Sequence, residues 1–125
     1  MSTKLHDFAR HAILNTGLTP RTVTSSVNGS AVDLLTGDGR CFALQQVGTV
    51  SGTSPTLAGK IQESADGSTW SDISGATFTT VTASDNVQAI TFDRSQRYVR
   101  YFGTVGGSSP SFAVAVLISE QKKQI

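Results

Sequence analysis

The amino-acid sequence predicts an all-β protein: an antiparallel β-sandwich or jelly roll of about eight strands, with a short N-terminal helix or arm. Serine, threonine and glycine are abundant, which suits short strands joined by many turns. Runs that alternate apolar and polar residues follow one another between those turns. One strand–turn–strand motif also occurs twice, at residues 48–58 and 103–113. Two such copies favour a sheet built by near-repetition over a scaffold arranged around one catalytic cleft.

Length and charge set the next limits. A chain of 125 residues makes one domain, with an arm or helix expected at residues 1–20, the sandwich at 21–119 and a tail at 120–125. The 10 lysines and arginines nearly balance the 9 aspartates and glutamates, so neither nucleic acid nor a membrane is an expected partner. No apolar run approaches the roughly 20 residues of a membrane span. No signal peptide is recognisable, so we expect synthesis in the cytosol.

The N-terminal segment predicts a short amphipathic helix over residues 4–14, with a stop at residues 15–17. A helix of about three turns is marginal alone, so its apolar side must rest on another surface. That surface belongs either to the same domain or to a neighbouring chain. The residues at helical spacing on this side are Leu5, Phe8, Ala9, Ala12 and Ile13.

After Pro20 the pattern changes to β runs bounded by turn residues. The pair Asn28-Gly29 predicts a hairpin, each copy of the repeated motif predicts another around its Gly-Ser/Thr-Pro turn, and Asp66-Gly67 predicts a further turn. An open barrel is the alternative to a sandwich. The expected strands are residues 22–27, 31–35, 40–50, 56–64, 68–73, 76–82, 87–92, 96–105 and 111–119.

Superposing the two motif copies predicts which residues face the core. Leu57 and Ile61 align with Phe112 and Val116, and Leu44 aligns with Val99, so the apolar positions agree. The register of residues 97–102 stays open, because their alternation does not assign an inner face.

The last strand, residues 111–119, is the most apolar, and both of its faces look buried. One explanation is a central strand covered on both sides. The other is that its second face contacts another subunit, and that face carries Ala113, Ala115 and Leu117.

Neither catalysis nor a bound cofactor or metal is expected. His6 and His11 lie five residues apart without nearby ligands, and Cys41 has no histidine in the β region to activate it. Cys41 is therefore expected to be a small buried residue. The stretch 52–61 lacks the glycine and the hydroxyl residue of a phosphate loop. Carboxylates are spread singly, which leaves only a calcium site pooled from separate loops as an alternative.

The aromatic residues bear on carbohydrate binding, which uses a platform of exposed rings. The one tryptophan, Trp70, is expected to cap the core rather than to face a ligand. Tyr98 and Tyr101 point to opposite faces of a strand, so they form no flat platform. The basic cluster, which we expect to pair with local carboxylates or with another subunit, comprises Arg94, Arg97 and Arg100.

Several segments together resemble small structural proteins of tailed bacteriophages and prophages. The resemblance covers roughly residues 28–118. The Asp66–Trp70 stretch alone is less specific, since it also resembles discoidin-type and other sugar-binding sandwiches. The segments that carry the resemblance are residues 48–57, 61–73, 75–78, 97–100 and 107–112.

The resemblance implies a virion protein, not an enzyme: a capsid decoration or cement protein that forms a homo-oligomer, such as a trimer, and binds the major capsid protein. Two alternatives stay open, a tail or baseplate component and a carbohydrate-binding module on a spike with a glycan as partner. A near-neutral surface and a rigid sandwich suit the role of a capsid decoration protein. The expected partner interface combines the N-terminal segment with the last strand, at Leu5, Phe8, Ala12, Ile13, Ala113, Ala115 and Leu117.

Overall fold

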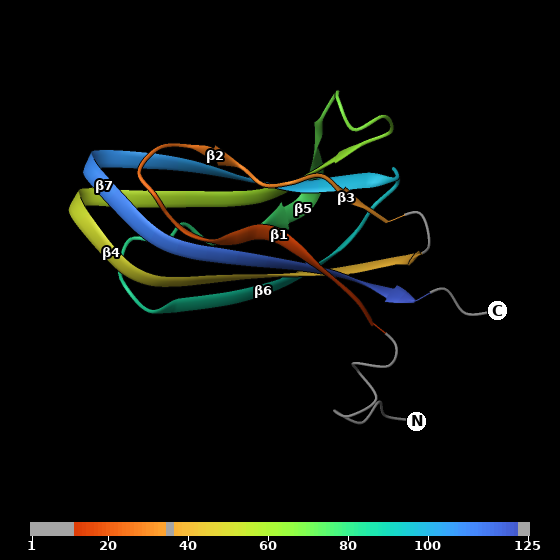
Figure 1. Cartoon of the computed structure of the whole chain (residues 1–125), viewed down its shortest axis with the longest axis horizontal. Coiled ribbons are helices and arrows are strands. Elements are labelled where there is room, and N and C mark those ends of the chain that lie inside the picture. Colours follow the sequence, from red (N-terminus) through yellow and green to blue (C-terminus); the bar gives the residue numbers. More distant parts are fainter. Residues whose placement is uncertain (1–11, 35–36, 123–125) are drawn as a thin grey trace.

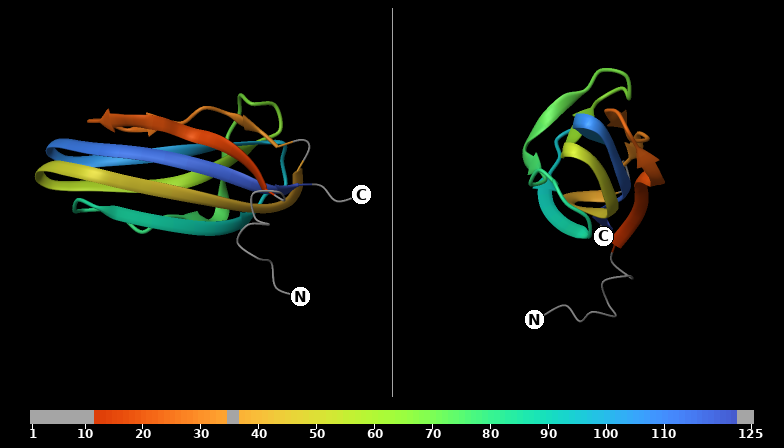
Figure 2. Two further views of the ribbon diagram at one scale, coloured as in Figure 1. Left: turned by 60° about the horizontal axis from the view of Figure 1, so that its bottom comes forward. Right: turned by 90° about the vertical axis from the view of Figure 1, so that its left-hand side faces the viewer.

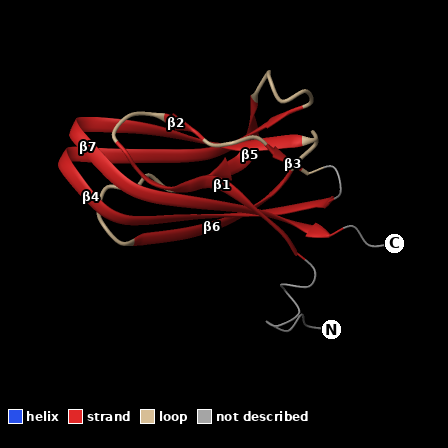
Figure 3. Cartoon of the chain, in the orientation of Figure 1, coloured by secondary structure: helices blue, strands red, loops and turns tan. Residues whose placement is uncertain are grey.

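The computed structural model describes residues 12–34 and 37–122 and joins seven β-strands in one antiparallel sheet (Figure 1). The described residues contain no helix (Figure 3). The prediction of an all-β antiparallel fold is confirmed. The strands are β1 (Ala12–Val23), β2 (Val27–Asn28), β3 (Val32–Asp33), β4 (Gly37–Ser64), β5 (Ser71–Thr77), β6 (Asn86–Asp93) and β7 (Tyr98–Lys122).

Two very long strands form the centre of the sheet. β4 has 28 residues and β7 has 25, and they pair antiparallel from Gly37 beside Lys122 to Ser64 beside Tyr98. The paired strands bend back over themselves together, at one end of the molecule (Figures 1 and 2). We call this pair the β4–β7 ribbon.

The repeated motif makes the bend. Gly52 and Gly107 have φ angles of 111° and 109°, and Ser54 and Ser109 have φ angles of 48° and 49°. The same turn conformation therefore occurs in both strands, and the two turns lie side by side within the ribbon. The hairpins predicted at these motifs are wrong, because each strand continues through its turn and bonds to the other copy. Gly-Ser-Pro residues signal a change of direction but do not reveal which strand lies alongside.

The bend divides the sheet into two layers. The first layer contains β1, β6, and the parts of the ribbon at residues 40–50 and 111–122. The second layer contains β2, β3, β5 and the parts at residues 56–64 and 98–106. Hydrogen bonding joins both layers in a single sheet. The finer assignment of the fold as a sandwich or a jelly roll therefore stays a prediction.

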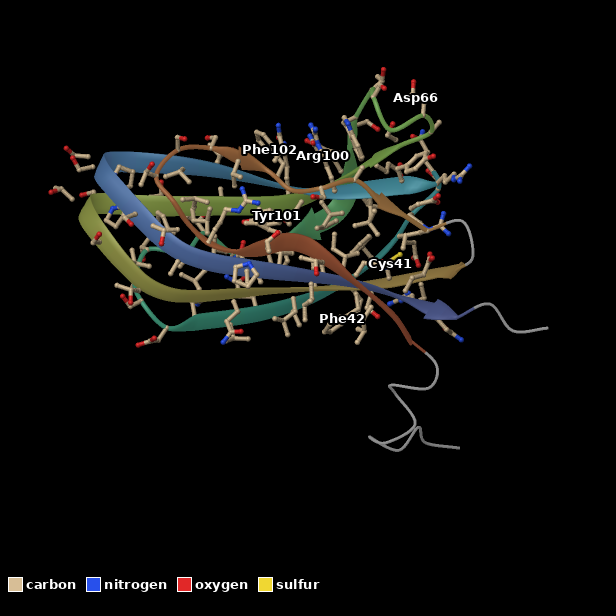
Figure 4. The ribbon with its side chains drawn as sticks, in the orientation of Figure 1. Cys41, Phe42, Asp66, Arg100, Tyr101 and Phe102 are labelled. Carbon is tan, nitrogen blue, oxygen red and sulfur yellow. The ribbon has the colours of Figure 1, made fainter. Side chains whose placement is uncertain are left out.

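The inner sides of the two layers pack into one hydrophobic cluster. Leu57, Ile61, Phe112 and Val116, which the motif alignment placed inside, are each no more than 1% exposed. That part of the register is confirmed. Figure 4 shows Tyr101 between the layers, where its hydroxyl donates a hydrogen bond to Oε1 of Gln45 in the opposite layer.

The alignment of Leu44 with Val99 is wrong. Val99 is fully buried, whereas Leu44 is half-buried on the outer side of the first layer. The register of the ribbon shifts between Val47 and Val50, where β4 holds one extra residue. Because side chains alternate along a strand, one extra residue moves the preceding side chains to the other face.

The prediction of an N-terminal helix is wrong for the residues of that segment that the structure describes. β1 begins at Ala12 and pairs with β7 as far as Val23, so residues 12–14 of the predicted helix and its stop at 15–17 lie in a strand. Residues 4–11 lie outside the described residues. Pairing with the long edge of β7 outweighs the weak helical preference of a short segment. Residues 12–20 of the expected arm and 120–122 of the expected tail therefore belong to the sheet.

The prediction of a hairpin at Asn28-Gly29 is also wrong. β2 and β3 each pair with β7 and not with each other. The Gly29 N–H donates to the Tyr101 carbonyl at 2.7 Å, which keeps the intervening chain beside β7. By contrast, Asp66-Gly67 lies, as predicted, in the loop between the paired strands β4 and β5.

Replacing Gly107 with alanine tests the bend. A Cβ atom there would lie 2.7 Å from the Ser54 carbonyl oxygen and 2.9 Å from Pro55 Cα, in a backbone conformation that alanine rarely adopts. We expect a loss of about 2–4 kcal/mol in the free energy of unfolding, measured with urea.

Gly75→Ala is the matched control for that variant. Gly75 also has a positive φ, of 80°, but a Cβ atom there would meet nothing within 4 Å. We expect Gly75→Ala to lower the free energy of unfolding by about 1–2 kcal/mol, which is the cost of the left-handed backbone conformation alone. Equal losses in both variants would show that the close approach of the two turns contributes nothing.

Candidate interaction surfaces

The outer side of the first layer is an apolar surface formed by four neighbouring strands. Rows of side chains cross β1, β7, β4 and β6 in register. Figure 4 shows Phe42 on this outer side, with Cys41 on the inner side of the same strand. We call this surface the apolar face. Its rows are Leu14–Ser119–Phe42–Thr91, Thr16–Leu117–Leu44–Ala89 and Ala115–Gln46–Val87.

The apolar face holds the large hydrophobic side chains that are most exposed in the described part of the chain. Val87 is 62% exposed, Leu14 59% and Leu117 44%. Its three rows contain no charged residue, while the ion pair Arg40–Asp93 lies at its border with 3.7 Å between Nη1 and Oδ1. An apolar centre with a charged border is typical of a protein–protein interface.

A shallow hollow of about 450 Å³ lies on the same face. It forms where pairing is irregular in both neighbouring strands, near Pro20 in β1 and Gly48 in β4. Proline has no N–H to donate to a ladder, and the small side chains beside it leave room. The hollow is lined by Pro20, Arg21, Thr22, Gln46, Gly48, Ala113, Val114 and Ala115.

The predicted interface residues of the last strand meet on this face. Ala113 and Ala115 are half-buried beside the hollow, and Leu117 is exposed in the central row. Ala12 and Ile13 lie in β1 beside Gln121 and Glu120. Leu5 and Phe8 lie outside the described residues. That these residues contact a partner stays a prediction.

Most of the apolar face is not predicted from the sequence. Leu14 lies at the end of the predicted helix, and the motif alignment places Leu44 on the core side. Phe42 and Val87 lie in predicted strands whose neighbours the sequence does not identify. The alternation of Val87, Ala89 and Thr91 was a signal that could have been used. It shows an apolar side that faces away from the buried Phe92.

Cys41 lies in a buried polar cluster rather than in a reactive site. Glu120 is 1% exposed, and its carboxylate accepts hydrogen bonds from the Arg94 guanidinium and from the Cys41 thiol, the latter at 3.5 Å. Arg94 also donates to the carbonyl oxygens of Leu34 at 2.6 Å and Gln96 at 2.9 Å. Such a buried, multiply bonded ion pair fixes chain segments relative to one another. The expectation of a small buried cysteine is confirmed.

The environment of Cys41 suppresses its nucleophilic form. Burial, followed by the charge of Glu120 and its hydrogen bond, raises the pKa of the Cys41 thiol to about 12. A thiol with such a raised pKa stays protonated near neutral pH, and the thiolate is the reactive species.

The outer side of the second layer is polar and aromatic. Figure 4 shows Arg100 and Phe102 there, and the Arg100 guanidinium lies 4.6 Å from the Trp70 ring centre. The expectation that Trp70 caps the core is wrong: the ring is half-buried beneath an arginine, outside the core cluster. Lys60 lies over the Phe102 ring at 5.5 Å. Cation–π contacts of this kind hold these rings in place.

The arginine cluster pairs locally, as expected for two of its members. Arg97 donates to both carboxylate oxygens of Asp33, at 2.9 and 2.7 Å, and Arg94 pairs with Glu120. Arg100 instead donates to the Gln62 side chain at 2.9 Å. Tyr98 and Tyr101 lie on opposite sides of β7, since Tyr101 is buried in the core and Tyr98 contacts Arg97.

The carboxylates of the described chain do not gather as metal ligands. No group of three or more His, Cys, Asp or Glu residues there could hold a metal ion, and His6 and His11 lie outside the described residues. In the β4–β5 loop, Asp66 accepts hydrogen bonds from the backbone N–H groups of Thr69 and Ser68, which lowers its pKa to about 2. The described chain likewise has no helix able to cross a membrane.

Thiol labelling tests the environment of Cys41. At about pH 8.5, where an ordinary thiol is half ionised, we expect the folded chain to react with a thiol reagent at least ~100-fold more slowly than the unfolded chain. Because the folded pKa is raised, folding stability should also fall as the pH rises above the ordinary pKa of a thiol. The control is a double variant, Cys41→Ser with Thr104→Cys, which moves the thiol to an exposed position. Equal labelling rates in the native chain and in this double variant would contradict the burial.

Comparison with known proteins supplies a structural neighbour. No protein-family model matches the chain, and no curated protein matches its sequence. Among solved structures, it is similar to the crystal structure of SPBc2 prophage-derived protein YomS, with a TM-score of 0.50 and 11% sequence identity. The match covers 87% of this chain and 93% of that chain. At this identity the similarity shows that the two chains share a fold.

Proposed function

We propose that the chain is a structural protein of a tailed-phage or prophage virion. In this proposal it is a capsid decoration or cement protein, with a sheet of the jelly-roll kind, that forms a homo-oligomer such as a trimer. It binds the major capsid protein and stabilises the lattice.

The apolar face carries the proposal. Leu14, Val87 and Leu117 are exposed in rows that contain no charged residue, and covering such apolar side chains with another protein is favourable. Sequence segments that resemble phage structural proteins, and a fold shared with a prophage-derived protein, support a phage context. Binding at many lattice positions lets modest contacts add up to a resistant shell.

Carbohydrate binding has less support from the arrangement of the aromatic residues. A sugar platform presents an open ring, whereas one face of Trp70 carries the Arg100 guanidinium. Host-glycan binding that is lost in Trp70→Ala would support that role instead.

Separated virion parts test the proposed function. Particles of the encoding phage would be divided into heads and tails, and the chain located in each fraction by mass spectrometry. We expect it in the heads, and we expect heads lacking it to release DNA at a lower temperature than complete heads.

Adding purified protein back to the deficient heads should restore their heat resistance. Thr104→Asp, on the second layer, serves as a control that should restore it equally well. Finding the chain in tails alone would contradict the decoration role and favour a tail or baseplate component.

A further inference from the structure

We infer that the apolar face is the docking surface for the N-terminal segment, residues 1–11, of a second copy of this chain. In this arrangement Leu5 and Phe8 are the anchors, and the Phe8 ring fills the hollow beside Gly48. The inference rests on the self-association in the proposed function and names the surfaces that make it.

The chemistry of the two surfaces matches. The apolar face presents Leu14, Val87 and Leu117 to solvent without a neighbouring charge in its rows. The hollow of about 450 Å³ is lined by small or apolar residues together with Arg21 and Gln46, and it has the size to receive an aromatic ring, over which an arginine can also stack. Residues 1–11 carry Leu5 and Phe8 among polar residues. Moving these two apolar side chains from water onto an apolar surface is favourable.

The segment starts at the border of the face. β1 begins at Ala12 beside Gln121, and Leu14, two residues further on, belongs to the first row of the face. Eleven extended residues reach at most about 36–40 Å. The face extends about 20 Å along β7 from Ala113 to Ser119, at ~3.3 Å per residue. The segment is therefore long enough to cross an adjoining face.

The sequence next to β1 favours a second copy over the same copy. To cover its own face, the segment must reverse direction just before β1. Residues 8–14 contain no glycine, proline, asparagine, aspartate or serine, the residues that make tight turns. A segment that continues in the direction of β1 would leave its own sheet, and in our inference it docks on a second copy. Mutual exchange of this kind closes a symmetric oligomer.

Complementation between two full-length variants tests the exchange. The segment variant carries Leu5→Asp and Phe8→Asp, and the face variant carries Val87→Asp and Leu117→Asp. Wild type should be oligomeric by analytical ultracentrifugation, and each variant alone should self-associate at least ~100-fold more weakly. A mixture should form mixed oligomers, because the intact segment of one variant docks on the intact face of the other.

Two kinds of control keep the result specific. Thr3→Asp and Thr104→Asp each add a single negative charge, within the segment and on the second layer respectively, and both should associate like wild type. Gln46→Trp starts from an exposed position and fills the hollow without adding charge, and it should weaken association as well. Circular dichroism checks that every variant is folded.

Three outcomes overturn the inference. Variants that associate like wild type would show that these surfaces are not the contact. Loss of association without rescue on mixing would show that the segment covers its own face or that the contact lies elsewhere. A wild-type chain that is monomeric yet binds heads would contradict the segment exchange and agree with the proposed function. Rescue on mixing, in a chain that never binds heads, would support the exchange and contradict the proposed function.

Discussion

The shared bend of β4 and β7 is the constraint on which the rest of the structure depends. Both strands turn at the same point, because Gly52 and Gly107 lie against the opposite copy of the motif, where a side chain would meet backbone atoms. Had only one strand turned, the pairing would end there and the two layers would separate. The coupled bend instead keeps the ladder continuous and brings the inner faces of both layers together.

Polar contacts then fix how the layers meet. Tyr101 from the second layer donates to Gln45 in the first, and burial raises the pKa of the tyrosine hydroxyl, which stays a donor. Gly59 makes room for this pair, because a Cβ atom there would lie 2.4 Å from the Gln45 oxygen. Away from the bend, Arg94 connects β7, through Glu120, to the chain at Leu34. Each contact specifies one alignment of the layers, since a shift would leave buried polar groups unpaired.

The sequence predicted strands and core better than it predicted neighbours. Alternation placed Leu57, Ile61, Phe112 and Val116 inside because burial acts on each strand locally. Turn residues did not reveal that each motif copy pairs with the other, and an extra residue near Gly48 reversed the face of Leu44. The last strand directed attention to Ala113, Ala115 and Leu117, but the apolar face also needs Leu14 and Val87. Those residues meet them only through pairings distant in sequence, which no local pattern encodes.

The long β4–β7 ribbon has a consequence for how the chain folds. Its pairs run from Ser64 beside Tyr98 to Gly37 beside Lys122, so none of them is local in sequence. Chains dominated by such distant contacts fold slowly, typically in milliseconds to seconds, because closing a long loop costs conformational entropy before the contacts that stabilise it have formed. The pair with the smallest loop, at Ser64 and Tyr98, is the cheapest to form. Every pair between β1 and β7, from Val23 beside Phe112 to Ala12 beside Gln121, is more distant in sequence than any pair of the ribbon. We therefore expect the strand that carries the N-terminal segment to join the sheet late.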